Sequence, residues 1–169
     1  MVIIARARAG FTLLELLIVI TIIAILSAAL IGTMGIVQKR SRISLTKAQF
    51  DLLKSALSRY EGDFDDYPPS DGDLVKGAQN LYSCLTTTKK GGPYIQPGDI
   101  PTCDATGNGD TAFADQWKRP IYYMHHHDYR NQVPNKQTFH LISAGPNGAL
   151  ENGEKNSDDI VNWDKDKPE

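Results

Sequence analysis

The chain has 169 residues, of which 41% are hydrophobic and 22% are charged, and its formal net charge is −2. This length leaves room for one globular domain beyond an apolar N-terminal segment. Because there is no excess of basic residues, nucleic acid is not expected as the main partner. The sequence carries no pattern of a phosphate-binding loop, a Ser-His-Asp triad or a zinc protease, so we expect no enzymatic activity.

An apolar run begins at Phe11 and reaches Ile36, and Glu15 is its only ionisable residue. More than 18 largely apolar residues can cross a hydrocarbon core of about 30 Å as a helix. We therefore predict a transmembrane or assembly helix over residues 11–37, preceded by a short basic leader over residues 1–10. A carboxylate is costly in lipid, so Glu15 needs a partner.

The six residues from Gly10 to Glu15, Gly-Phe-Thr-Leu-Leu-Glu, resemble the processing site of type IV pilins and type II secretion pseudopilins. In that family prepilin peptidase cuts after the Gly and the new N-terminal Phe is methylated, which assigns these roles to Gly10 and Phe11. The freed amine of Phe11 in one subunit is then a natural partner for the Glu15 carboxylate of another. At 4 Å such a pair gains about 4 kcal/mol at an effective dielectric of 20, before desolvation.

Two other interpretations of the apolar run stay open. One is an ordinary signal anchor in which Glu15 is incidental. The other is a secretory signal that is cut after the small residues Ser27-Ala28-Ala29.

Helical periodicity continues over residues 38–62, where two adjoining apolar rows recur at spacings of three and four. No Pro precedes Pro68, so we predict one helix from about Phe11 to about Tyr60, ended by Glu61-Gly62-Asp63. We expect local melting on assembly near Gly32 and Gly35, because Gly costs about 1 kcal/mol against Ala inside a helix. The rows consist of Leu45, Ala48, Leu52 and Ala56, and of Phe50, Leu53, Leu57 and Tyr60.

Residues 63–169 are predicted to form a globular head. A short helix is expected near Val75 to Leu85, and Thr86 to Phe113 is rich in Gly, Thr, Pro and Asp, as in a loop. Strands over 121–124 and 137–142 are expected to form an antiparallel hairpin. These elements predict an α+β, pilin-like fold in which the distal half of the long N-terminal helix packs on a small antiparallel sheet.

Residues Asp115 to Tyr123 are similar to the pseudopilin pattern Asp-Pro-Trp-Gly-x-Pro-x-x-Tyr. Gln116 and Lys118 depart from that pattern, which leaves the chemistry of the turn open. We expect Trp117 to be a core residue.

The segment from Leu141 to Trp163 resembles the C-terminal loop of major pseudopilins, which in that family binds Ca²⁺. Ca²⁺ takes six to eight oxygen ligands, which a Gly-rich loop with Asn and Asp can supply. Carried over by position, the resemblance assigns the carbonyls of Ala144 and Ala149 and the side chain of Asn147, where the family usually has Asp. The second carboxylate stays open among Asn156, Asp158 and Asp159. The alternative is an acidic, solvated loop.

The two cysteines are a candidate disulfide pair. Cys84 and Cys103 lie in the part placed in the periplasm, where a disulfide would constrain the intervening loop by about 3 kcal/mol in the chain-entropy model. Two free thiols are the alternative.

Residues 125–127 are three consecutive histidines. Adjacent strand residues point to opposite faces, so we expect a polar strand end rather than a shared metal ion.

The resemblance implies a structural function. The subunit would be anchored in the inner membrane with a periplasmic head and polymerise with itself into the pseudopilus of a type II secretion system. Minor pseudopilins and an inner-membrane assembly platform would be its further partners. A type IV pilus subunit for adhesion, motility or DNA uptake stays an alternative, as does a membrane-anchored periplasmic binding protein that never polymerises.

Overall fold

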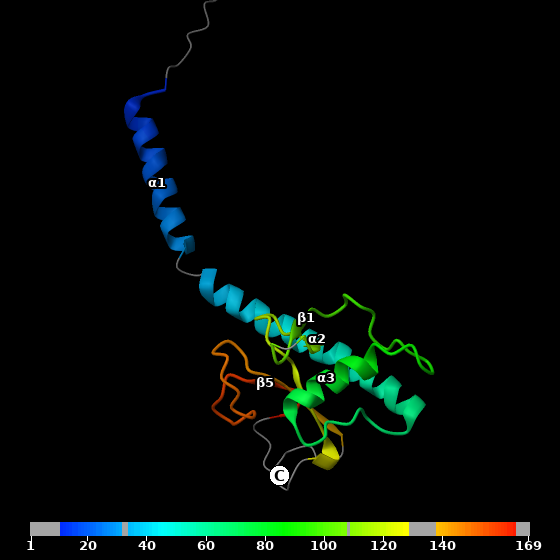
Figure 1. Cartoon of the computed structure of the whole chain (residues 1–169). Helices are drawn as coiled ribbons and strands as arrows, with labels where there is room; N and C mark the ends of the chain where they lie inside the picture. Colours follow the sequence, from blue (N-terminus) through cyan, green and yellow to red (C-terminus); the bar gives the residue numbers. More distant parts are fainter. Residues whose placement is uncertain (1–10, 32–33, 108, 129–137, 165–169) are drawn as a thin grey trace, which may run out of the picture. The chain divides into compact units, whose positions relative to one another are not determined.

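The computed structural model describes residues 11–31, 34–107, 109–128 and 138–164 of the chain. It divides into two compact units, the first reaching Gln38 and the second beginning at Lys39. Figure 1 shows the elements in chain order, beginning with helices α1 (Leu13–Ile31) and α2 (Met34–Phe64).

Two Thr hydroxyls at and within helix α1 make local hydrogen bonds. Thr12 directly precedes the helix, and its hydroxyl accepts a hydrogen bond from the backbone N–H of Glu15 at 3.2 Å. A Thr followed three residues later by Glu is the sequence signature of a capping box at a helix start. The hydroxyl of Thr21 donates to the carbonyl of Leu17 at 2.7 Å. The side chains that remain on α1 are almost all apolar.

The single helix predicted from Phe11 to Tyr60 is described as two helices, because α1 ends at Ile31 and α2 begins at Met34. Gly32, where local melting was expected, lies outside the described residues, and Gly35 lies within α2. In the described part of the chain, no helix combines the length and the apolarity needed to cross a membrane.

Helix α2 buries one of its two predicted apolar rows. The row from Phe50 to Tyr60 lies in the core, together with Ala56, whereas Leu45 and Leu52 of the other row are 49% and 52% exposed. The helix ends at Phe64, and Asp65 takes a left-handed backbone conformation with φ of 60°. Its N–H donates to the carbonyl of Glu61 at 2.8 Å, a common way to close a helix. The stop thus lies slightly beyond the predicted Glu61-Gly62-Asp63, and Gly62 is helical.

Helix α3 (Leu74–Leu85) confirms the predicted short helix and is capped by Asp73, whose carboxylate accepts the N–H groups of Val75 and Lys76. The helix packs closely on the strand that carries Tyr123. A Cβ added to Gly77 would lie 2.0 Å from the Tyr123 carbonyl oxygen, so this crossing requires glycine.

A three-stranded antiparallel sheet completes the core, with β4 (Phe139–Ser143) between β3 (Tyr122–His125) and β5 (Ile160–Val161). The β3–β4 pair confirms the predicted hairpin, with Tyr122 opposite Ile142. Strand β5 was not predicted. Helices packed on small antiparallel sheets confirm the α+β, pilin-like fold.

The stretch predicted as loop contains a second, two-stranded sheet, formed by β1 (Thr102–Asp104) and β2 (Thr111–Phe113). The turn between them is organised by Asp104, whose carboxylate accepts the N–H groups of Thr106, Gly107 and Gly109. The prediction was wrong here because three-residue strands are too short to display an alternation of buried and exposed residues.

Candidate functional site

The C-terminal loop, residues 144–159, connects β4 to β5. Ser143, the last residue of β4, pairs with Ile160, the first residue of β5. The sheet therefore holds the two ends of the loop side by side, which brings residues far apart in the sequence into one small region.

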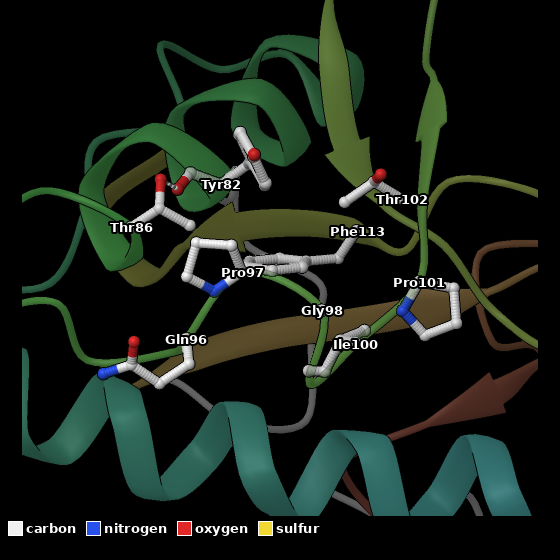
Figure 2. Close-up of a pocket in the computed structure, with 9 residues that line it drawn as sticks. All are labelled: Tyr82, Thr86, Gln96, Pro97, Gly98, Ile100, Pro101, Thr102 and Phe113. Carbon is white, nitrogen blue, oxygen red and sulfur yellow. Dashed lines mark hydrogen bonds between the residues drawn. The ribbon is translucent and has the colours of Figure 1, made fainter.

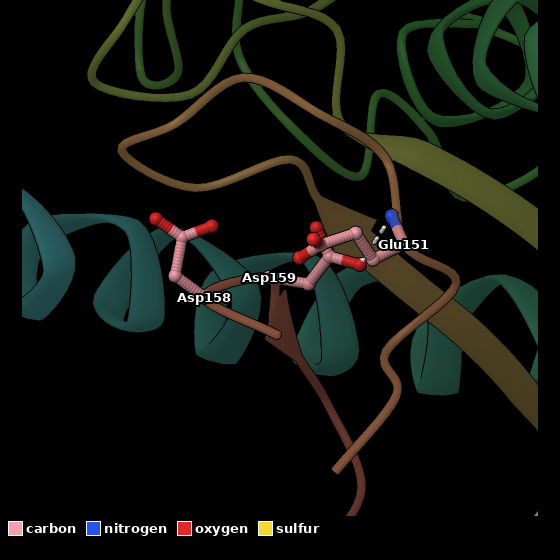
Figure 3. Close-up of side chains that lie close together, drawn as sticks. All are labelled: Glu151, Asp158 and Asp159. Carbon is pink, nitrogen blue, oxygen red and sulfur yellow. Dashed lines mark hydrogen bonds between the residues drawn. The ribbon is translucent and has the colours of Figure 1, made fainter. Parts of the chain in front are cut away.

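Three carboxylates meet in this loop. Ligand oxygens of Glu151, Asp158 and Asp159 all lie within 4.8 Å of one another, and Figure 3 shows the Glu151 and Asp159 side chains in close approach. Asp159 is the most enclosed, with only 4% of its surface exposed. Its Oδ2 accepts the N–H groups of Glu151 at 2.9 Å and Gly153 at 2.8 Å. These bonds fix the orientation of the Asp159 carboxylate.

One oxygen of each carboxylate in this acidic cluster is buried without a hydrogen-bond partner: Glu151 Oε2, Asp158 Oδ1 and Asp159 Oδ1. Buried polar atoms are normally paired, and several unpaired carboxylate oxygens close together repel one another. A cation bound among them would remove both costs. Carboxylates mixed with backbone and amide oxygens are the ligands that Ca²⁺ prefers, so the donor set fits this ion.

The structure brings together only part of the ligand set that the sequence suggested. Asp158 and Asp159 both belong to the acidic cluster. Asn147 is exposed, and its Oδ1 accepts the N–H of Ala149 at 2.7 Å. The carbonyl of Ala144 accepts the N–H of Gly148 at 3.1 Å, which leaves it a second lone pair.

Glu151 was not predicted as a candidate ligand. Its carboxylate reaches the acidic cluster because the loop folds back on itself, and no spacing rule singles it out. Asn156, one of the three candidates for the second carboxylate position, is exposed.

The turn over residues 115–119 lies next to this loop. Asp115 is buried, and its Oδ1 accepts the N–H groups of Trp117 at 2.8 Å and Arg119 at 3.0 Å. Its Oδ2 accepts the hydroxyl of Ser143 at 2.6 Å, at the point where the loop begins. Lys118 has φ of 63°, the left-handed conformation that Gly adopts at lower cost. The turn therefore places Lys in a backbone conformation suited to the family's Gly, and Trp117 packs at the edge of the core.

The two cysteines are free thiols, which corrects the disulfide prediction. Burial, followed by the neighbouring Cys84 of α3, raises the pKa of Tyr60. Cys103 lies on β1, where burial and the nearby carboxylates of Asp115 and Asp104 raise the pKa of its thiol. Cys84 and Cys103 thus lie in different surroundings. The raised pKa keeps the Cys103 thiol protonated and therefore weakly nucleophilic.

The three histidine rings gather at the end of β3, contrary to the expected divergence. Ring centroids lie 4.3 Å apart for His125 and His126 and 4.0 Å apart for His126 and His127. The strand ends at His125 and a 3₁₀ turn, η1 (His126–Asp128), begins, so the alternation of a strand no longer applies. His125 Nε2 lies 2.9 Å from Asp66 Oδ1, which ties this turn to the segment after α2.

Acid should weaken this histidine cluster. Burial, with the neighbouring His125 and His127, lowers the pKa of His126, whose Nδ1 is buried without a hydrogen-bond partner. The unfolded chain therefore binds more protons around pH 6, and the stabilisation present above about pH 6.5 is lost as the pH falls through the folded pKa. We expect His126→Gln to reduce the fall in melting temperature between pH 7 and pH 5. An unchanged fall in this variant would contradict the assignment to His126.

The carboxylates around the histidine cluster act in a different pH range. Hydrogen bonds from His125 and Ser70 lower the pKa values of Asp66 and Asp128, respectively. Their stabilisation is present above their unfolded pKa of about 4 and is lost only below it. Measurements between pH 7 and pH 5 therefore separate the imidazole effect from these acids.

A small hollow of about 200 Å³ lies between α3 and the β1–β2 hairpin, and Figure 2 shows its aromatic wall, Tyr82 and Phe113. Its nine lining residues include no carboxylate, imidazole, amine or thiol. The lining residues are Tyr82, Thr86, Gln96, Pro97, Gly98, Ile100, Pro101, Thr102 and Phe113.

The N-terminal site is only partly described. Gly10 and the leader lie outside the described residues, whereas Phe11 is 72% exposed and precedes α1. Glu15 sits in the first turn of α1 and is the only ionisable residue of that helix. The structure thus places the predicted assembly carboxylate at the exposed start of an apolar helix.

Comparison with known proteins gives one matching family model and two similar curated proteins. Residues 5–31 match the prokaryotic N-terminal methylation motif. The chain is 27% identical over 159 residues to the type II secretion system core protein G of Pseudomonas aeruginosa, covering 94% of this chain and 97% of the relative. It is 30% identical over 157 residues to the protein of that name in Escherichia coli K12, covering 91% and 90%. No solved structure matches the chain. The similarity to these two relatives covers at least nine-tenths of the chain, and the chain therefore belongs to the pseudopilin family of the type II secretion system core protein G.

Proposed function

We propose that this pseudopilin polymerises with itself into the periplasmic fibre of a type II secretion system. Helix α1 carries the proposal, because its apolar side chains are exposed almost throughout, with Leu13 at 84% and Ile25 at 65%. Monomeric soluble proteins rarely expose contiguous apolar patches larger than a few hundred Å². Other copies of α1, or lipid before assembly, are the surroundings that such a helix requires.

The proposal extends to the location and partners of the subunit. Before assembly, α1 anchors the chain in the inner membrane and the head lies in the periplasm. Arg6 and Arg8 in the leader suit a cytoplasmic N-terminus, since Lys and Arg favour that side of the membrane. Prepilin peptidase, minor pseudopilins and an inner-membrane assembly platform complete the set of partners. Similarity to core protein G over nearly the whole chain favours this fibre over a type IV pilus.

The same proposal includes Ca²⁺ as a structural ion of the C-terminal loop. Glu151, Asp158 and Asp159 would hold it, with further oxygens from the loop backbone and Asn147. When bound, the ion supplies positive charge that offsets the repulsion among the three carboxylates. The three buried oxygens without partners support this inference over a merely solvated acidic loop.

Processing can be tested by the intact mass of protein extracted from membranes. We expect the loss of residues 1–10 and one added methyl group on Phe11. Cells without prepilin peptidase provide the control, in which the full 169-residue mass should persist. A mature N-terminus near Leu30 would indicate a secretory signal instead, and an intact leader in normal cells would favour an anchored protein that never polymerises.

A further inference from the structure

Arg119 connects the turn over residues 115–119 to the C-terminal loop. Its Nη1 donates a hydrogen bond to the carbonyl of Gly145 at 2.8 Å. Its guanidinium also lies directly against Gly148, since a Cβ added there would be 2.3 Å from Arg119 Cζ. The half-buried arginine therefore holds the first part of the loop at two points.

The segment that Arg119 holds is in turn packed against Asp158. A Cβ added to Gly145 would lie 2.2 Å from the carbonyl oxygen of Asp158, so the two backbones are in direct contact. The N–H of Asn147 donates to Asp158 Oδ2 at 3.0 Å. Contacts thus run without a gap from Arg119, through Gly145 and Asn147, to one carboxylate of the acidic cluster.

Arg119 is itself fixed from the opposite side. Its N–H donates to the buried carboxylate of Asp115, and the N–H of Asp115 donates to the Arg119 carbonyl at 2.8 Å. Asp115 also binds Ser143, the residue from which the loop starts. The guanidinium is therefore carried by a rigid turn that shares an anchor with the loop it contacts.

We propose that Arg119 is a positioning residue for the cation site: it holds the Gly145–Gly148 segment against Asp158 and so raises the affinity of the loop for Ca²⁺. This inference rests on the Ca²⁺ binding included in the proposed function. Residues that orient metal ligands without touching the metal commonly contribute 10- to 100-fold to affinity.

A purely electrostatic role of Arg119 predicts the opposite change in Ca²⁺ affinity, so the direction of the change distinguishes the two interpretations. A guanidinium near a cation site repels the incoming ion, so removing that charge would strengthen binding. Removing a positioning contact would weaken binding. Lys cannot replace the planar fork of Arg at two contacts, so Arg119→Lys keeps the charge and loses the geometry.

The experiment is a calorimetric titration of the full chain in detergent with CaCl₂, well below the melting temperature. We expect Arg119→Gln to raise the dissociation constant by about 10-fold or more, and Arg119→Lys to raise it in the same direction. Lys118→Gln is the matched charge control and should leave affinity unchanged or slightly higher. Arg59→Gln is the matched contact control, because Arg59 also donates to a backbone carbonyl, that of Tyr94, and it should leave affinity unchanged.

A double-mutant cycle distinguishes loss of the Arg119–Gly148 contact from misfolding of the Arg119 variant. Gly148→Ala pushes a methyl group into the guanidinium, and it should weaken binding more in the wild-type background than beside Arg119→Gln, where the clash is gone. Equal or tighter binding by Arg119→Gln and Arg119→Lys, with wild-type binding intact, would overturn the role of Arg119 alone. A wild-type chain that binds no Ca²⁺ would overturn the cation site and this inference together.

Discussion

Glu15→Gln should abolish fibre assembly while leaving the subunit in the membrane. In the proposed fibre the carboxylate of Glu15 pairs with the freed amine of Phe11 in another subunit. Such a pair gains about 4 kcal/mol at 4 Å and an effective dielectric of 20, before desolvation, and the fibre repeats it at every interface. Gln has nearly the same shape and removes only the charge. Electron microscopy of sheared fibres and membrane fractionation measure the two outcomes.

Matched variants separate the charge of Glu15 from its place in helix α1. Thr12→Ala removes the hydroxyl that accepts the Glu15 N–H and should cost about 1 kcal/mol of helix stability, yet fibres should form. Glu15→Val should behave as Glu15→Gln does and enter the membrane at least as well, since it removes a polar group from lipid. Normal fibres from Glu15→Gln would refute the pairing, and loss of fibres from Thr12→Ala would indicate a capping role instead.

The apolar rows of helix α2 could be predicted from the sequence because they repeat at helical spacing. The row from Phe50 to Tyr60 repeats at helical spacing, and it is buried. A repeat alone cannot say which of two adjoining rows faces the core. The row containing Leu45 and Leu52 remains largely exposed because α3 and the sheets cover only one side of α2.

The features that sequence did not predict depend on chain reversals. Strand β5 has two residues and exists because the C-terminal loop returns to β4, where Ile160 pairs with Ser143. The same return brings Glu151 to Asp159, although no motif relates them. The histidine rings converge because a strand gives way to a 3₁₀ turn at His126. Each case is set by tertiary contacts that a local pattern does not encode.

Asp159→Asn should abolish stabilisation of the head by Ca²⁺. Asp159 Oδ2 is occupied by two backbone N–H groups, and its buried Oδ1 has no hydrogen-bond partner. Asn can still accept those N–H groups, but it removes one negative charge from the acidic cluster. With chelator present the variant should therefore be at least as stable as the wild type, because like-charge repulsion falls. With Ca²⁺ at one hundred times its dissociation constant, the wild type should gain about 2.7 kcal/mol and the variant almost nothing.

Melting curves of the full chain in detergent, with Ca²⁺, Mg²⁺ or chelator, measure this effect. Mg²⁺ should act much less, because it sheds water reluctantly and requires a tighter octahedron. Asp99→Asn, an exposed carboxylate outside the loop, is the control and should keep the full calcium shift. Asn156→Ala should keep it as well, whereas Asp158→Asn should lose most of it, because Asp158 Oδ1 is also buried without a partner. A wild-type curve indifferent to both calcium and chelator would mean that the three carboxylates are tolerated without an ion.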